Sequence, residues 1–393
     1  MAKVDVISSC VIRMEGSSTN PISRLDPTPW DLQMLSLDYC IQKGILFQKP
    51  QSQQTLIPHL KASLSRTLST SSLRSPAASP PPPTTTARSA SSSTATTPES
   101  ITSFFADIGS PNSEGASRPL LAVQVTELVD GVFIALTANH VAVDGVSFWH
   151  FFNSWSEISR GSDTISKTPV FEHSVRVRNS PLRLPPLEKS SYVLPPPTLL
   201  ERVFHFSKQT LSNLKAKANS EAGTDKVSSL QVMSAHLWQA LSRHRYSGIS
   251  LDDLIGREDP LAMVVGSRPR MPLPELVREG IGHVAAKINE LVARHTKDAI
   301  VKMLEDWVEC PAVLRRGSFS FLISSTPRHD VYVNDFGWGK PVAVRSGPTQ
   351  KFDGKMTLFP SVEGGGIDVE VCLATETLQA VEHDAEFMEA FAV

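Results

Sequence analysis

A stretch made almost wholly of Ser, Thr, Ala and Pro interrupts this chain between two segments rich in core-type residues. It covers residues 69–100, STSSLRSPAASPPPPTTTARSASSSTATTPES, and contains one Leu and no aromatic residue. Such a stretch cannot bury enough apolar surface to offset the entropy that ordering costs, so we predict disorder here. The folded core must therefore be assembled from the segments on either side of it.

The segment before this stretch contains three predicted elements. Residues 3–13 carry β-branched residues at strand density, and residues 30–47 predict a short helix that leads into a strand. Residues 56–68 predict an amphipathic helix, because apolar residues recur there on one helical stripe. The members of that stripe are Leu56, Ile57, Leu60, Leu64 and Leu68.

The segment after it predicts two strands and a helix. The strands, 120–128 and 132–138, are joined through Asp130-Gly131, a favoured hairpin dipeptide. The helix covers residues 145–158, where four aromatic residues fall on roughly one side. Residues 160–200 are rich in Pro, a composition that suits an extended crossover between domains.

The second half of the chain alternates predicted strands and helices. Strands are expected at 203–206, 263–266, 318–324, 342–344, 355–360 and 367–374, and helices at 207–218, 228–243 and 282–307. The mixture predicts an α/β fold with mixed sheets. A chain of 393 residues is long enough for two domains. We expect an N-terminal domain at 1–159, a linker at 160–200 and a C-terminal domain at 201–393.

Charge and cysteine usage exclude several classes of function. The formal net charge is -2, and no block of one sign suggests binding to nucleic acid or to a membrane surface. The four cysteines are scattered, with no partner at zinc-ligand spacing, so we expect free thiols and no metal site. The N-terminus lacks the apolar region of a signal peptide, and no apolar run approaches a membrane span, so we expect a cytoplasmic protein.

A histidine at the end of a predicted strand is the first candidate for chemistry. The sequence ALTANHVAVDGVSFWH places His140 where strand 132–138 ends, with Asp144-Gly145 before the next helix. Side chains at a strand end project into a cleft more readily than into the core. Imidazole is the side chain best suited to accept a proton near neutral pH. Taken alone, however, an HxxxD match is weak, and a structural histidine is the favoured interpretation.

A second motif changes that interpretation. NDFGWGKP occupies residues 334–341, about two hundred residues after His140. HxxxDG followed at this distance by DFGWG resembles the plant BAHD acyl-CoA-dependent acyltransferases. Other segments that are similar to this family are PWDLQML, YCIQKGILF, SRPLLAVQVTELVDG, SSLQVMSAHLWQA and KFDGKMTLFP.

The resemblance implies a two-domain fold like that of chloramphenicol acetyltransferase. It implies that His140 is the general base, and that acyl-CoA is a co-substrate, with no further cofactor. The acceptor would be a hydroxyl or amine of a small plant metabolite, and the enzyme a monomer. Asp144, with Gly145 beside it, matches a structural aspartate that pairs with an arginine, for which Arg268 is the candidate.

The resemblance also assigns the remaining motif positions. The DFGWG residues match a turn that supports the scaffold away from the chemistry: Asp335, Phe336, Gly337, Trp338 and Gly339. Ser325 lies near the position that the family uses for the oxyanion, and is the candidate donor there.

Three departures from the family pattern put activity in doubt. The low-complexity segment stands where the family has a strand reading approximately FPPLAGRL, and a shifted reading frame over residues 71–79 would account for it. The family segment between that strand and Ser117 is mostly absent, and so is a YFGN-like motif after Pro274. Because missing sheet elements leave edges and cavities, we expect a poorly stable, weakly active chain.

Two alternatives stay open. One is a related HxxxDG enzyme that acts on carrier-bound acyl groups, such as a condensation domain, although DFGWG argues against it. The other is a non-catalytic remnant, or a sequence translated from a wrongly assigned gene structure.

Overall fold

The chain forms two compact units in the computed structural model. Unit 1 holds Met1–Leu187, Leu304–Leu314 and His329–Gln350, and unit 2 holds Glu188–Met303, Arg315–Arg328 and Lys351–Val393. The structure describes residues 5–12, 27–36, 40–50, 56–70, 91–92, 101–107, 109–115, 117–170, 198–247, 258–263, 270–311 and 321–391.

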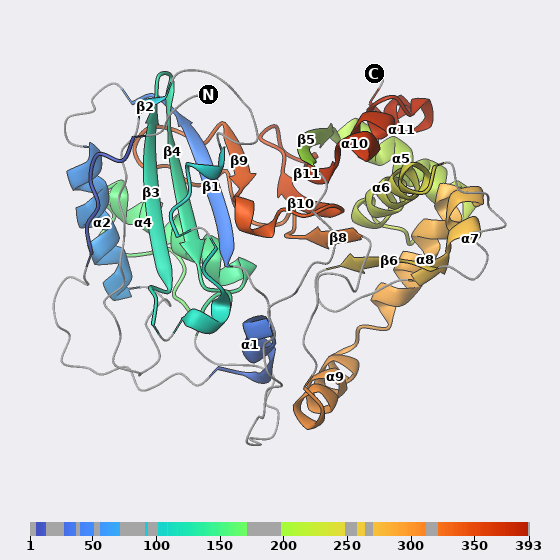
Figure 1. The fold of residues 1–393 in the computed structure, drawn as a ribbon, viewed down its shortest axis with the longest axis horizontal. Helices are drawn as coiled ribbons and strands as arrows, with labels where there is room; N and C mark the ends of the chain where they lie inside the picture. The colour runs from blue at the N-terminus through green and yellow to red at the C-terminus, as the bar shows by residue number, and fades with distance from the viewer. Residues whose placement is uncertain are drawn as a thin grey trace. The chain divides into compact units, whose positions relative to one another are not determined.

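Unit 1 is built on a five-stranded sheet with the order β2-β3-β4-β1-β9 (Figure 1). The predicted hairpin forms its centre, and β3 (Leu121–Leu128) and β4 (Gly131–Ala138) pair antiparallel through the turn at 129–130. Strand β1 (Ile41–Gln48) pairs antiparallel with β4 on one side and with β9 (Ala343–Ser346) on the other. The short β2 (Ser91–Ser92) adds a parallel pair at Glu127 and Leu128.

Two helices of unit 1 pack on each other beside this sheet. They are α2 (Leu56–Thr70) and α4 (Gly145–Ser159), and both were predicted from their apolar stripes. Trp155 of α4 is 1% exposed, and its indole N–H donates to Ser63 Oγ of α2 over 3.0 Å. A buried indole that finds an acceptor contributes packing without leaving an unpaired donor. The shorter elements of this unit are α1 (Pro29–Gln33), η1 (Met34–Ser36), η2 (Asn112–Glu114) and η4 (Pro348–Gln350).

Strand β9 belongs to a different unit from the one that the predicted domain division gave it. The expected C-terminal domain, 201–393, included the DFGWG segment, but residues 329–350 belong to unit 1. The reason is strand pairing, because Val344 of β9 lies opposite Ile45 of β1 in an antiparallel ladder. Such pairing depends on contacts distant in sequence, which local patterns do not record. The domain boundaries at 159 and 201 stay a proposal.

Unit 2 contains a six-stranded mixed sheet with the order β5-β11-β10-β8-β6-β7. Pairs β5–β11, β10–β11 and β6–β7 are antiparallel, and pairs β8–β10 and β6–β8 are parallel. The strands are β5 (Leu199–Phe206), β6 (Glu258–Met263), β7 (Arg270–Pro272), β8 (Phe321–Ser324), β10 (Lys355–Pro360) and β11 (Ile367–Ala374).

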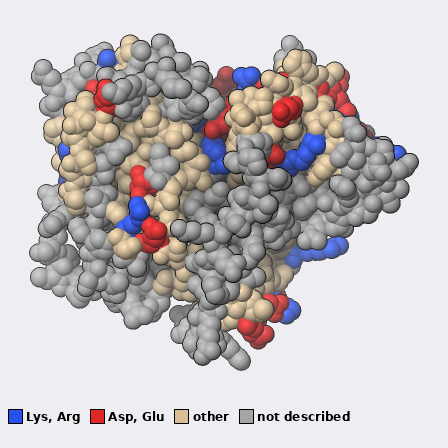
Figure 2. Space-filling view, in the orientation of Figure 1, with Lys and Arg blue, Asp and Glu red and all other residues tan. Residues whose placement is uncertain are grey.

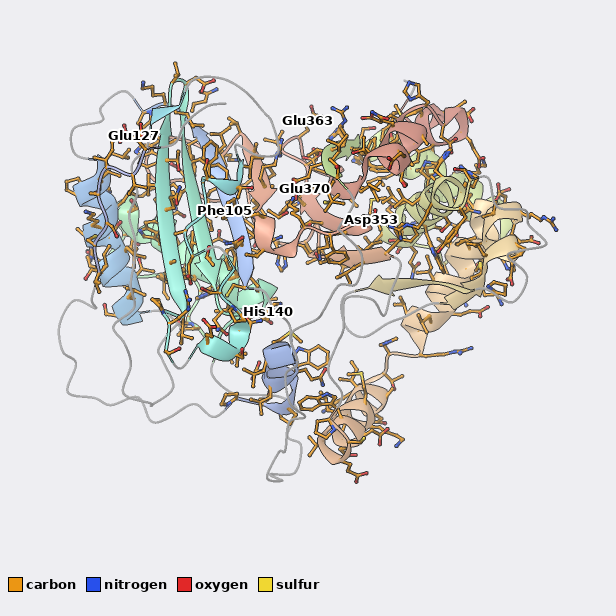
Figure 3. All side chains as sticks on the ribbon, in the orientation of Figure 1. Phe105, Glu127, His140, Asp353, Glu363 and Glu370 are labelled. Atoms are coloured by element: carbon orange, nitrogen blue, oxygen red, sulfur yellow. The ribbon has the colours of Figure 1, made fainter. Side chains whose placement is uncertain are left out.

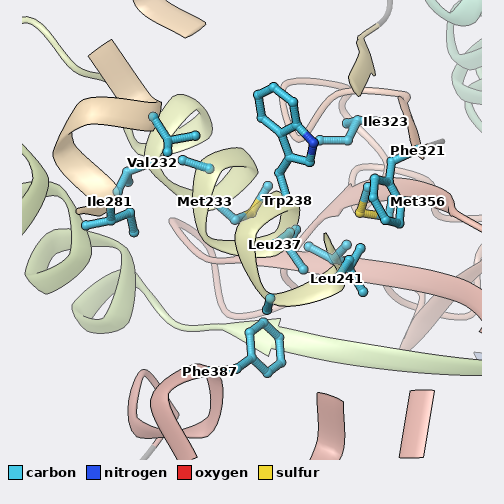
Figure 4. Close-up of a cluster of buried hydrophobic side chains, with 14 of the residues drawn as sticks. Val232, Met233, Leu237, Trp238, Leu241, Ile281, Phe321, Ile323, Met356 and Phe387 are labelled. Carbon is cyan, nitrogen blue, oxygen red and sulfur yellow. The ribbon is translucent and has the colours of Figure 1, made fainter. Parts of the chain in front are cut away.

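Helices cover this sheet and supply much of the core of unit 2. The central helix is α6 (Ser229–Arg245), in which every residue from Gln231 to Ser242 is buried. Figure 4 shows Trp238 and Leu241 of α6 among side chains of the sheet and of neighbouring helices. The other helices are α5 (Lys208–Glu221), α7 (Leu273–Arg278), α8 (Ile281–Ala293), α10 (Thr375–Glu382) and α11 (Ala385–Glu389), while α9 (Lys297–Glu309) is divided between the two units.

One buried cation ties three segments of unit 2 together. Lys351 Nζ lies 2.7 Å from a carboxylate oxygen of Glu201 and also contacts the carboxylate of Glu370. Although burial lowers the pKa of the Lys351 ammonium, Glu370 and Glu201 raise it above its ordinary value. Removing the lysine would leave the buried carboxylate of Glu370 and the half-buried one of Glu201 without this partner, so we assign it to the scaffold.

Several element predictions need correction. The strand expected at 3–13 is wrong for its described part, because residues 5–12 form neither helix nor strand. The helix expected at 282–307 is two helices, α8 and α9. The strand expected at 263–266 shares only Met263 with β6, and residues 264–266 lie outside the described residues. The disorder predicted for 69–100 is wrong for its described part, because residues 69–70 end α2 and residues 91–92 form β2. Residues 71–90 and 93–100 lie outside the described residues, and so do 171–197 of the expected linker.

Surface charge and hydropathy add two general features. On the face drawn in Figure 2, acidic and basic side chains lie in small groups of both signs over the described surface. Within the described stretches, no helix has both the length and the apolar character that crossing a bilayer requires.

Candidate active site

The sequence motif around His140 forms a sharp turn between β4 and α4. Figure 3 labels His140 at the end of the unit 1 sheet. The strand ends at Ala138, and the backbone N–H groups of the next three residues are each hydrogen-bonded. The Asn139 N–H donates to Leu120 O over 2.9 Å, the His140 N–H to Asn112 Oδ1 over 2.8 Å, and the Val141 N–H to Asn139 Oδ1 over 3.0 Å.

Two asparagines supply most of these bonds, and they are linked to each other. Asn112 is 1% exposed and Asn139 is 4% exposed. Asn139 Nδ2 donates to the backbone oxygen of Asn112 over 2.9 Å, and Asn112 Nδ2 donates to Met34 O over 3.0 Å. The turn that carries His140 is therefore held by buried amides from outside the HxxxD motif.

Asp144 caps the helix that follows. Its Oδ1 accepts the backbone N–H and the hydroxyl of Ser147, each over 2.7 Å, so Asp144 is the N-cap of α4. A carboxylate at this position satisfies a free helical N–H and stabilises the helix dipole. The expected arginine partner, Arg268, lies outside the described residues, so the Asp144–Arg268 pair stays a proposal.

A second histidine packs against the glycine of the motif. A Cβ added at Gly145 would lie 3.0 Å from His329 Nε2, and the His329 and Trp149 ring centroids are 6.5 Å apart. Burial lowers the pKa of His329 below its ordinary value; Asp144 and Asp330 oppose that change, and Lys43 adds to it. His329 is thus a half-buried imidazole that favours the neutral form at pH 7.

The DFGWG motif forms a turn organised by its aspartate. Asp335 Oδ1 accepts the backbone N–H groups of Gly337 over 2.8 Å, Trp338 over 3.1 Å and Gly339 over 3.0 Å. Both glycines have positive φ, +95° and +89°, which residues with a side chain adopt only at a cost. One carboxylate and two glycines therefore specify the shape of this turn.

The aromatic residues of the turn anchor it in the core of unit 1. Phe336 is 2% exposed, and its ring meets Trp155 of α4 edge to face, with centroids 4.9 Å apart. The rings of Phe336 and Trp338 also meet Phe47 of β1 edge to face, each with centroids 5.6 Å apart. These contacts join the motif to the helix that begins at Gly145. The scaffold role of the motif stays a proposal.

The remaining candidate, Ser325, follows β8 in unit 2. It has a positive φ of +68°, which is unusual for a residue with a Cβ. Its neighbour Ser324 accepts a hydrogen bond from Lys355 Nζ over 2.5 Å. The structure thus gathers His140, Asp144, Gly145 and the DFGWG turn in unit 1, whereas Ser325 belongs to unit 2, and its role at the oxyanion stays a proposal.

Three residues of this region, Asn112, Asn139 and His329, were not predicted from the sequence. Asn139 directly precedes His140 and could have been noted as a polar residue at the end of an apolar strand. His329 stands six residues before Asp335, and nothing in that interval connects it with Gly145. Asn112 lies in the loop-like sequence SPNSEG, and no local pattern relates it to His140, 28 residues later.

Comparison with known proteins identifies relatives over most of the chain. A model of the Transferase family matches residues 93–388. An uncharacterized acetyltransferase of Arabidopsis thaliana is 33% identical, with 99% of each chain covered. The BAHD acyltransferase DCR of the same plant is 32% identical, covering 74% of this chain and 68% of that protein.

Solved structures support the same fold. The structure of F. graminearum TRI101 with ethyl coenzyme A superposes with a TM-score of 0.71 at 16% sequence identity. The match covers 93% of this chain and 98% of that one. Together with the two mixed sheets, it confirms the predicted α/β fold of the chloramphenicol acetyltransferase type.

Proposed function

Because this chain belongs to the plant BAHD acyltransferase family, we propose that it transfers an acyl group from acyl-CoA to a small plant metabolite, with His140 as the general base. The acceptor is a hydroxyl or an amine. The observation that supports this most is the position of His140, at a strand end and on a turn whose backbone N–H groups are each hydrogen-bonded.

The proposed reaction proceeds by direct transfer. His140 Nδ1 is buried, which favours Nε2 as the nitrogen that meets the acceptor. It removes the proton as the acceptor oxygen or nitrogen attacks the thioester carbonyl. The tetrahedral intermediate collapses, the carbon–sulfur bond breaks, and the coenzyme A thiolate takes the proton from the imidazolium. No covalent acyl-enzyme is required.

The other motif residues support this step without taking part in it. Asp144 holds the start of α4 and, in the proposal, pairs with Arg268 and not with the imidazole. Asp335 and its two glycines shape a turn that packs against the same helix. Ser325 would donate a hydrogen bond to the oxyanion of the tetrahedral intermediate. The protein acts as a cytoplasmic monomer in this proposal.

A donor screen tests the proposal. The folded protein is incubated with acetyl-, malonyl-, hydroxycinnamoyl- and long-chain acyl-CoA, together with a mixture of plant alcohols and amines, while free thiol is measured. Thiol release that depends on the acceptor mixture would support an acyltransferase. A cooperatively folded sample that releases no thiol with any donor would favour the non-catalytic remnant.

A further inference from the structure

A buried asparagine distant in sequence from the motif fixes the backbone of the proposed base. The Asn112 side chain lies between two segments, because its Oδ1 accepts the His140 N–H over 2.8 Å and its Nδ2 donates to Met34 O over 3.0 Å. Both ends of one amide are thus used, and the side chain is 1% exposed. A buried amide with both ends bonded has little freedom to move.

Asn112 also forms a hydrogen bond with Asn139, the residue that precedes His140. The backbone oxygen of Asn112 accepts from Asn139 Nδ2 over 2.9 Å, and Asn139 Oδ1 in turn accepts the Val141 N–H. This arrangement depends on close packing, because a Cβ added at Gly115 would lie only 2.8 Å from Asn139 Nδ2. Residues 139–141 are therefore held by a connected pair of amides.

We propose that Asn112 is a positioning residue for His140, setting the place of the imidazole by holding the backbone N–H from which its side chain extends. The proposal rests on the proposed function, since it names how the same site is assembled. Asn112 does not touch the reacting atoms. It acts because a general base that moves by about 1 Å can lose about 100-fold in rate.

The structural alternative is that Asn112 stabilises unit 1 without any effect on the base. Asn334 offers a matched control, since it is 0% exposed and its Nδ2 donates to Asn153 Oδ1 over 2.7 Å and to Val331 O over 2.8 Å. It is a buried asparagine of the same unit with a bridging amide, but these bonds reach α4 and residue 331 instead of the turn at 139–141. Loss of its amide should lower stability alone.

The test compares Asn112→Ala with Asn334→Ala. We expect Asn112→Ala to lower kcat by about 10- to 100-fold, with the KM for acyl-CoA changed by less than about threefold. Asn334→Ala should lower the melting temperature comparably and leave kcat within about twofold. Similar kcat values for Asn112→Ala and the wild type, or an equal loss of kcat in both variants, would overturn the proposal.

A second measurement separates this inference from the proposed function. Hydrogen exchange of the His140 amide should become faster in Asn112→Ala and stay unchanged in Asn334→Ala, whether or not the protein turns over. If the wild type releases no thiol with any donor, the proposed function fails, while the exchange rate still decides whether Asn112 holds His140. An unchanged His140 exchange rate in Asn112→Ala would contradict the positioning role directly.

Discussion

His329 meets Gly145 at the first turn of α4, and that contact gives a prediction at the scale of the residue. In the wild type, Gly145→Ala should destabilise unit 1 by about 1 kcal/mol, because the added methyl group lies 3.0 Å from His329 Nε2. In a His329→Ala background the contact is gone. The same change should then stabilise by about 0.5–1 kcal/mol, since Ala favours helix over Gly.

Urea unfolding of the four proteins of this double-mutant cycle measures the difference. The sign of the Gly145→Ala effect should reverse between the two backgrounds. The same sign and size in both would show that His329 does not constrain the glycine of the motif.

Residues that stand in sequence motifs were the easier ones to propose as site residues. His140, Asp144 and DFGWG were found because they stand in motifs with recognisable spacing. Asn112 and His329 were not, because each acts through a contact that only the folded chain creates. A polar residue in a loop carries no local sign of the partner it will meet.

At the scale of the element, the clearest difference from the prediction is that the single helix expected at 282–307 is divided into α8 and α9. The apolar pattern over 282–307 is interrupted by the polar residues 294–298, and Thr296 caps a new helix there, because its Oγ1 accepts the Ala299 N–H over 3.2 Å. The Arg294 and His295 N–H groups bond within the last turn of α8. The polar interruption and the capping hydroxyl together separate the two helices.

Replacing that cap should loosen α9. Thr296→Ala should lower the local stability of its first turn by about 1 kcal/mol, whereas Thr296→Ser retains the acceptor and should change it little. Hydrogen exchange of the amides of residues 299–301 reports the effect. Equal protection in the Ala and Ser variants would show that the side chain does not set the start of the helix.

The positions of the strands were predicted more accurately than the pairing of one strand with another. The Asp130-Gly131 dipeptide predicted the central hairpin of unit 1, and the strands expected at 355–360 and 367–374 are β10 and β11. The pairing of β9 with β1 was not predictable, because almost three hundred residues separate the two strands and nothing local encodes the choice.

At the scale of the whole molecule, stability should depend on pH through a buried histidine of unit 2. His236 is 8% exposed and its Nε2 donates to Phe387 O over 3.2 Å. Burial lowers its pKa to about 4, although the Phe387 carbonyl, Glu386 and Asp384 oppose this change and Arg243 adds to it. Between this value and its ordinary pKa of 6.5, the unfolded chain binds the proton more readily.

The direction of the pH dependence follows from this difference between the pKa of His236 in the folded chain and in the unfolded chain. The contribution of neutral His236 is present above about pH 6.5 and is lost as the pH falls toward 4, so unit 2 should lose about 2 kcal/mol between pH 7 and pH 5. Asp384, with a pKa lowered to about 2, stays charged over this range. Hydrogen exchange of α6 at the two pH values measures the loss, and His236→Gln should remove most of it. A loss of the same size in His236→Gln would assign the dependence to other groups.

The central claim is that His140 is the base of an acyl transfer, and the most direct test is the rate of thiol release with and without its imidazole. His140→Gln is compared with the wild type and with His205→Gln, which changes a half-exposed histidine of unit 2 paired with Asp368. The account predicts a fall of at least about 100-fold in His140→Gln and an unchanged rate in His205→Gln. A folded His140→Gln protein that releases thiol at the wild-type rate would contradict it.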